Sequence, residues 1–176
     1  GDTLYDYAGS VVEDGGCART DIYVKKEVDI TNWYEGQSSP QITSMTQSEY
    51  DRCRNVVRYI HYGDITHTDE YFRAEIEYAQ NMPHNMVSLT VRIEVYDIND
   101  TLLQMRTADY NPYTGRMTTL RLHNHSDTAR YDFGHDSYGN MSGAAMPANA
   151  NGQRLTMKYQ YDNTVHTYPV WAINSD

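Results

Sequence analysis

Two histidines separated by a single residue, His123 and His125, are the first residues in this sequence that could do chemistry. On a β-strand alternate side chains share a face, so both imidazoles would be presented together. Imidazole nitrogens bind transition metals, and the following His135 and Asp136 could complete a site. The pattern predicts a metal site at His123, His125 and His135. The alternative is an exposed turn at residues 124–127 whose histidines are incidental.

The His123-x-His125 pair resembles the first metal-binding motif of the cupins, a β-barrel family that holds a metal with His-x-His and a downstream Glu. The resemblance implies a metal-dependent enzyme built on a barrel, and it covers only the segment around these histidines. Gly115 lies farther from His123 than that motif requires, and no Glu occupies the expected place. We therefore favour the turn interpretation.

A second polar segment, residues 61–70, combines two histidines with three acidic residues. Histidine titrates near neutral pH and carboxylates tune it, so acid–base or metal chemistry is conceivable here. A polar connection between a helix and a strand has the same composition, and we favour that interpretation. The sequence contains no phosphate-binding loop, nucleophile elbow or His-Glu-x-x-His motif. We expect a protein that is not an enzyme and holds no cofactor.

The two cysteines, Cys17 and Cys53, suit one disulfide in an oxidising compartment. Such a bridge closes a loop of about 36 residues and stabilises the fold by roughly 4 kcal/mol in the chain-entropy model. The alternative is two unpaired thiols in a cytosolic protein.

Three Asn-x-Ser/Thr sequons begin at Asn99, Asn124 and Asn140. All three fall in expected turns or loops, where a glycan could be accommodated. Their number is what chance gives in a chain of this composition, so they remain possible N-glycosylation sites only.

Three aromatic side chains, Trp33, Tyr34 and Trp171, could stack on the rings of a sugar or enclose a small apolar ligand. They carry a second functional hypothesis, a glycan- or ligand-binding β module. A tryptophan in the core is the competing explanation.

One helix is expected, over residues 47–62. Thr46 and Glu49 have the spacing of a capping box, and Tyr50, Cys53, Val57 and Ile60 then recur at three- and four-residue intervals. Gly63 supplies a left-handed stop.

Elsewhere the period is two. The best strand spans residues 87–95, where Val, Leu and Ile alternate with polar residues, and residues 72–78 alternate in the same way. Further strands are expected at residues 21–30, 101–110, 116–123, 155–161 and 164–172, with one long loop at 138–152. Strands this close in sequence form antiparallel hairpins. We expect a single domain over residues 1–176, mainly β, an antiparallel sandwich or barrel-like meander with the helix packed against it.

The N-terminal stretch 3–12 is a candidate for assembly. Its apolar residues are Leu4, Tyr5, Tyr7, Val11 and Val12. A terminal strand of this kind can complete the sheet edge of a neighbouring copy. An intramolecular edge strand is the equally good alternative.

Composition supports a secreted or cell-surface protein. The chain has 17 Tyr, 2 Phe and a net charge of −10, and its mean hydropathy is −0.75. The acidic balance excludes a nucleic-acid partner, and no apolar run reaches the roughly 18 residues that a membrane helix requires. We expect a non-enzymatic extracellular structural or interaction protein, such as an adhesive or filament-forming subunit, which associates with itself, with another extracellular protein, or with a glycan.

Overall fold

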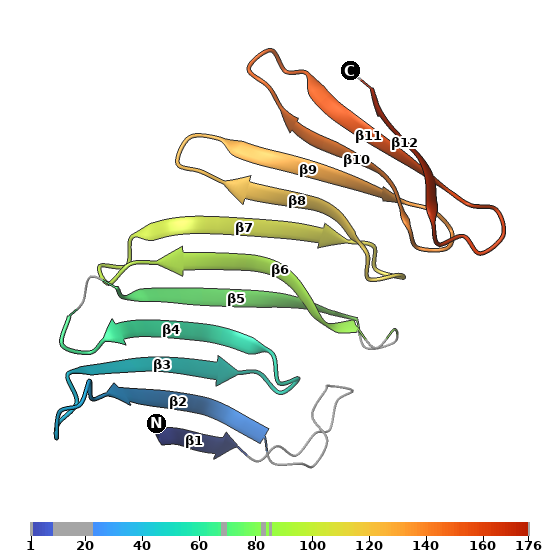
Figure 1. Cartoon of the computed structure of the whole chain (residues 1–176). Coiled ribbons are helices and arrows are strands. Elements are labelled where there is room, and N and C mark those ends of the chain that lie inside the picture. The colour runs from blue at the N-terminus through green and yellow to red at the C-terminus, as the bar shows by residue number, and fades with distance from the viewer. Residues whose placement is uncertain (1, 9–22, 68–69, 82–83, 85, 176) are drawn as a thin grey trace. The chain divides into compact units, whose positions relative to one another are not determined.

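The computed structural model (Figure 1) describes residues 2–8, 23–67, 70–81, 84 and 86–175. These residues form one antiparallel meander in which strands adjacent in sequence are hydrogen-bonded neighbours, in the order β1 to β12. The strands are β1 (Asp2–Ala8), β2 (Tyr23–Trp33), β3 (Ile42–Tyr50), β4 (Val56–Asp64), β5 (Phe72–Asn81), β6 (Met86–Tyr96), β7 (Leu102–Tyr110), β8 (Met117–His123), β9 (Thr128–His135), β10 (Met141–Ala148), β11 (Arg154–Tyr161) and β12 (Pro169–Ser175). The expectation of a mainly β, antiparallel fold is confirmed.

The chain divides into two compact units, Gly1–Met105 and Arg106–Asp176. In the first unit, the alternation expected for β5 and β6 is confirmed by their register. Ala74 lies opposite Val95 and Ile76 opposite Ile93, while Glu75 between them lies opposite Glu94. Apolar and charged side chains therefore occupy opposite faces of this hairpin.

The second unit contains strands β8 to β12, each paired antiparallel with the next. The expected long loop at residues 138–152 is wrong, because Met141–Ala148 form β10 between two short turns. The small residues of this segment have low β-strand propensity, so the sequence pattern did not predict the strand. At Gly143 the small size has a structural reason. A Cβ added to Gly143 would lie 3.1 Å from the backbone oxygen of Met157 on β11.

The helix expected over residues 47–62 is also wrong. Residues up to Tyr50 belong to β3 and those from Val56 belong to β4, and the two strands pair antiparallel. The turn between them is closed by the Asp51 carboxylate, which accepts the backbone N–H of Asn55 at 2.8 Å. The three- and four-residue spacing of apolar residues therefore comes from two strands and their turn, not from a helical face.

The other helix signals in this segment have local explanations. Thr46 and Glu49 lie inside β3, where both pair with β2 and β4, so they form no capping box. Gly63 does have a positive φ, 61°. It lies on β4 where the register with β3 shifts, and a Cβ there would meet the Glu70 side chain at 2.5 Å. The glycine is required by this close approach.

Burial in the sheet is shallow. Among the described residues, the buried apolar ones are Ile60, Ala74, Ala108 and Ala144, and no large side chain is fully buried. The strand order also ends at β1 and β12 without closing. The described strands therefore form one open antiparallel sheet, so the expected barrel is not closed and the expected sandwich is not confirmed.

Candidate functional site

A row of charged residues crosses five neighbouring strands of the first unit. Lys26 on β2 lies opposite Glu49 on β3, which lies opposite Arg58 on β4. Arg58 in turn lies opposite Glu75 on β5, and Glu75 lies opposite Glu94 on β6. Residues directly opposite on adjacent strands point to the same face, so these five side chains form one charged row.

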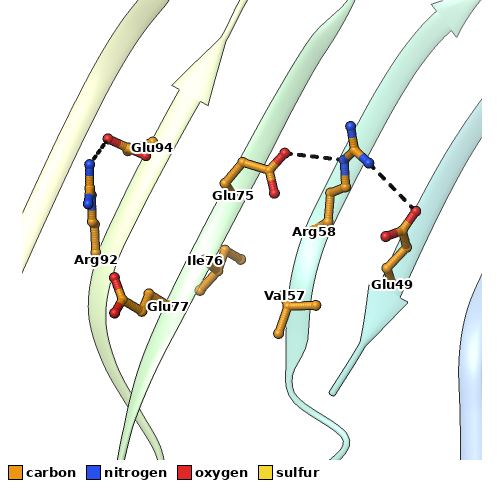
Figure 2. A pocket seen from close by; sticks show the side chains of 8 residues that line it. All are labelled: Glu49, Val57, Arg58, Glu75, Ile76, Glu77, Arg92 and Glu94. Atoms are coloured by element: carbon orange, nitrogen blue, oxygen red, sulfur yellow. Dashed lines mark hydrogen bonds and ion pairs between the residues drawn. The ribbon is translucent and has the colours of Figure 1, made fainter.

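Ion pairs connect the members of this row (Figure 2). Arg58 lies between two carboxylates, with its Nη1 3.9 Å from Glu49 Oε1 and its Nε 3.2 Å from Glu75 Oε1. Arg73 Nε reaches the same Glu75 oxygen at 2.9 Å, and Arg73 Nη1 donates to Asp100 Oδ1 at 2.6 Å. The repulsion between the opposed carboxylates of Glu75 and Glu94 is reduced at both residues. Arg58 and Arg73 form ion pairs with Glu75, and Arg92 donates a hydrogen bond to Glu94.

An open hollow of about 420 Å³ lies among these side chains, lined by Glu49, Val57, Arg58, Glu75, Ile76, Glu77, Arg92 and Glu94. The Arg92 pKa is raised by its hydrogen bond to Glu94, and the Arg73 pKa by its hydrogen bond to Asp100. Both guanidiniums therefore stay charged as ion-pair partners. No group of three or more His, Cys, Asp or Glu in the described part of the chain could hold a metal ion. The arrangement suits electrostatic cohesion or contact with a charged partner.

Four hairpin turns among the described residues share one construction. Each turn has five residues and begins with Asp or Asn at position 1. The backbone N–H of position 1 donates to the carbonyl of position 5, and the side-chain oxygen of position 1 accepts the N–H of position 5. The residue at position 4 has a positive φ. The turns are residues 51–55, 97–101, 136–140 and 149–153.

The asparagines that end two of these turns also link them to a second segment. Asn55, 8% exposed, donates through Nδ2 to Asp51 Oδ2 at 2.9 Å and to the Val87 carbonyl at 2.7 Å. Asn140 does the same in the second unit, to Asp136 Oδ2 at 3.0 Å and the His166 carbonyl at 2.6 Å. Asn55 therefore ties its turn to the start of β6, and Asn140 ties its turn to the β11–β12 turn.

Asp132 on β9 is the centre of a hydrogen-bonded cluster in the second unit. Its carboxylate accepts from Arg154 Nη1 at 2.7 Å, Arg130 Nε at 2.9 Å and Thr119 Oγ1 at 2.9 Å. Partial burial raises the Asp132 pKa, but these hydrogen bonds outweigh it and lower the pKa to about 2. Arg154 also donates to the backbone carbonyl of Met146, beside the register shift of β10. The cluster therefore fixes the pairing of β10 with β11.

Strand β12 is the last in the sheet and pairs only with β11 among the described residues. Its seven residues, PVWAINS, include no charged side chain. Val170 is 61% exposed, Trp171 47% and Ile173 43%. Sheet edges are ordinarily protected by charges, bulges or covering segments, and this one is apolar and open.

The predicted metal ligands are not brought together. Strand β8 ends at His123, so His125 lies in the following turn and the two do not alternate on one strand. The ring nitrogens of His123 contact threonine hydroxyls, Nε2 with Thr107 at 2.9 Å and Nδ1 with Thr128 at 3.3 Å. His135 ends β9. These histidines form no metal group among the described residues.

The three sequons differ in their surroundings. Asn99 and Asn124 are exposed in turns. Asn140 is part-buried, and both Nδ2 hydrogens are used in the hydrogen bonds described above. A glycan on Asn140 would break one of them. Cys53 lies in the β3–β4 turn, whereas Cys17 is outside the described residues, so the disulfide stays a prediction.

The predicted contact residues are exposed. Trp33 at the end of β2 is 56% exposed, and Tyr34 in the following turn is 47% exposed. Trp171 lies on β12, in the other unit. The predicted assembly strand is partly described. Leu4, Tyr5 and Tyr7 belong to β1, which pairs with β2 of the same chain, while Val11 and Val12 lie outside the described residues.

Sequence reasoning missed the repeated turns. Their signal is an Asp or Asn followed four residues later by a second hydrogen-bonding side chain, Asn, Thr or Gln, and this signal is present in the sequence. It also missed Asp132, whose partners are Thr119 on β8, Arg130 on β9 itself and Arg154 on β11. Only the register brings them together.

No family model matches the chain, and no curated protein matches it. Among solved structures, the crystal structure of TcdB2-TccC3-TEV is similar, with a TM-score of 0.52 and 14% sequence identity. The similarity covers 85% of this chain and 8% of that chain, so this chain spans a small part of that protein's length. At this identity the similarity shows the fold alone. The described residues also include no helix with the length and apolar character that a membrane crossing needs.

Proposed function

We propose that this chain is a non-enzymatic structural or interaction protein of the extracellular type, and that it extends its sheet by adding a β-strand at β12. The observation that carries this proposal is the open edge of β12, where Val170, Trp171 and Ile173 are all more than 40% exposed. An apolar edge strand offers backbone hydrogen bonds to any added strand, and its side chains set the register.

The added strand is β1 of a second copy. Strand direction alternates along the meander, so the odd-numbered β1 can pair antiparallel with the even-numbered β12 of a copy in the same orientation. A head-to-tail contact of this kind leaves a free β1 and a free β12 at the ends of each growing assembly, and it builds a filament when the rotation between copies does not close a ring.

Sizing by light scattering over a range of concentrations tests this proposal. We expect the mass of the unaltered chain to rise with concentration, and Ile173→Lys to prevent the rise because a charge on the edge blocks strand addition. Val165→Lys is the matched control, since Val165 is 56% exposed in the turn before β12. A monomer at every concentration, or equal loss of assembly in both variants, would refute the proposal.

A second candidate is glycan binding, which the exposure of the adjacent Trp33 and Tyr34 supports. A glycan array with the unaltered chain and with Trp33→Ala tests it. Binding that disappears in the variant supports the glycan-binding module, and the absence of any bound glycan rejects it.

A further inference from the structure

Six exposed apolar side chains lie at one edge of the first unit. They belong to the β2–β3, β4–β5 and β6–β7 connections and to the strand ends beside them, and Figure 1 places these connections on the same side of the sheet, at the left. This apolar edge consists of Trp33 (56% exposed), Tyr34 (47%), Ile42 (40%), Ile65 (52%), Ile98 (48%) and Leu102 (41%). Single exposed apolar residues are ordinary, whereas a group of them marks an interaction site.

Backbone pairing joins the first members of this edge. Trp33 lies directly opposite Ile42, the last pair between β2 and β3. The N–H of Ile65 donates to the carbonyl of Thr43 at 2.8 Å, so the β4–β5 connection begins beside Ile42. Trp33, Ile42 and Ile65 therefore belong to three consecutive strand ends.

The charges among these side chains have one sign. Glu35, Asp64, Glu70, Asp97 and Asp100 lie in the same three connections, and the described residues of those connections include no Lys or Arg. The nearest cation, Arg73, is already paired with Asp100 and Glu75. The apolar edge is therefore acidic.

The opposite edge of the same unit has the other character. Lys25 and Lys26 lie near the start of β2, and Arg52 and Arg54 lie in the β3–β4 turn. None of the exposed large apolar side chains of the described residues lies in that turn. The two edges thus differ in both polarity and charge.

We propose that the apolar edge binds a protein segment that is both apolar and basic. The apolar side chains supply contact area, and the surrounding carboxylates select Lys and Arg on the partner, as charge complementarity does at protein interfaces. Aliphatic residues such as Ile42 and Ile65 add nothing to a sugar stack, which argues against a glycan here. A second copy is not favoured on the described residues, because the β3–β4 turn of the basic edge holds none of their exposed large apolar side chains.

Tryptophan fluorescence tests this inference directly. The chain has two Trp, so a Trp171→Phe variant leaves Trp33 on the apolar edge as the sole reporter. The variant is titrated with two synthetic helical peptides of equal length and equal leucine content, one carrying lysines and the other glutamates. We expect the lysine peptide to shift the Trp33 emission to the blue until the shift saturates. Its binding should weaken as the salt concentration is raised. The glutamate peptide should leave the Trp33 emission unchanged.

A pair of matched variants separates this edge from general attraction to an acidic chain. Ile65→Ser removes a member of the apolar edge, and we expect it to weaken binding of the lysine peptide about fivefold to tenfold. Leu4→Ser removes a side chain that is 58% exposed on β1, away from that edge, and should leave binding unchanged. Circular dichroism confirms that both variants fold.

Five results would overturn the inference. The glutamate peptide could bind equally well, both serine variants could weaken binding equally, or neither peptide could alter Trp33. A blue shift of the Trp33 emission that appears at high protein concentration without peptide, and is reversed by dilution, would assign the edge to a second copy. A blue shift with a neutral oligosaccharide in place of the peptides would assign it to a glycan. The strand-addition proposal uses β12 and the Ile173→Lys variant, so either can fail without the other.

Discussion

Asp132 shows how much local order one carboxylate provides in a sheet without a deep core. Three donors from two other strands and its own strand converge on it, and its pKa is lowered to about 2. An Asp in an unfolded chain has a pKa of about 3.9. The ionised carboxylate therefore stabilises the folded chain above that value, and the contribution is lost as the pH falls toward 2.

This linkage predicts the behaviour of Asp132→Asn. The variant should unfold with a free energy about 1 to 2 kcal/mol lower than the unaltered chain at pH 7, since hydrogen bonds to a charged group are lost at a partly exposed site. At pH 2 the difference should shrink, because that pH equals the pKa of the folded carboxyl and about half of the Asp132 side chains are then protonated. Urea unfolding at both pH values measures this. A difference that is the same at both would contradict the role of the charge.

Gly139 and Gly152 occupy the same position in two of the repeated turns, with φ of 102° and 78°. A Cβ on Gly139 would overlap the Arg116 guanidinium, whereas a Cβ on Gly152 meets nothing within 4 Å. Gly152→Ala should lose about 1 kcal/mol from the unusual φ alone, and Gly139→Ala more than about 2 kcal/mol. Thermal and urea unfolding of the pair checks this. Equal losses would show that the Arg116 side chain moves aside without cost.

At the scale of the element, the hairpin turns and the side-chain hydrogen bonds of their residues fix where each strand begins and ends more than hydrophobic contacts do. Asn55 is one of the few buried polar residues, and it connects the β3–β4 turn to the start of β6. The Ser88 hydroxyl donates to its Oδ1 at 2.6 Å. The side chain thus serves as donor and acceptor for two segments at once.

Asn55→Ala should therefore destabilise the chain by about 2 to 3 kcal/mol, because the Val87 carbonyl and Ser88 hydroxyl lose a buried partner. Ser88→Ala removes one hydrogen bond of the same link and should lose about 1 kcal/mol. Chemical unfolding of both variants, with hydrogen exchange at Val87 as a local probe, tests the order. A larger loss for the serine variant would refute this account of the link.

The strands with strong alternation, such as β5 and β6, could be predicted from sequence because each buries one face against its neighbours. The hairpin around Asp51 could not, because the three- and four-residue spacing of Tyr50, Cys53 and Val57 imitates a helix when the turn is ignored. Strand β10 was hidden by Gly143 and its small neighbours, whose role is to let backbones approach. The charged row and the Asp132 cluster depend on register, which no single segment encodes.

At the scale of the whole molecule, the predicted Cys17–Cys53 bridge would connect the β3–β4 turn to residues upstream of β2. If it forms, reducing agent should lower the melting temperature, as loss of roughly 4 kcal/mol of loop-closure stabilisation implies. Thiol titration of the denatured chain, with and without reductant, measures the bridge itself. Two titratable thiols without reductant, and an unchanged melting temperature, would reject it.

Each strand in this sheet bonds only to the strands just before and after it in the chain, so no strand pairs with a distant part of the sequence. Such low contact order favours rapid folding, despite the all-β composition, because no distant segments must find one another. Folding should therefore propagate from one hairpin to the next, as it does in repeat arrays. Unfolding should begin with fraying of the terminal hairpins. A neighbour docked on β12 would then act as a cap that slows unfolding from that end.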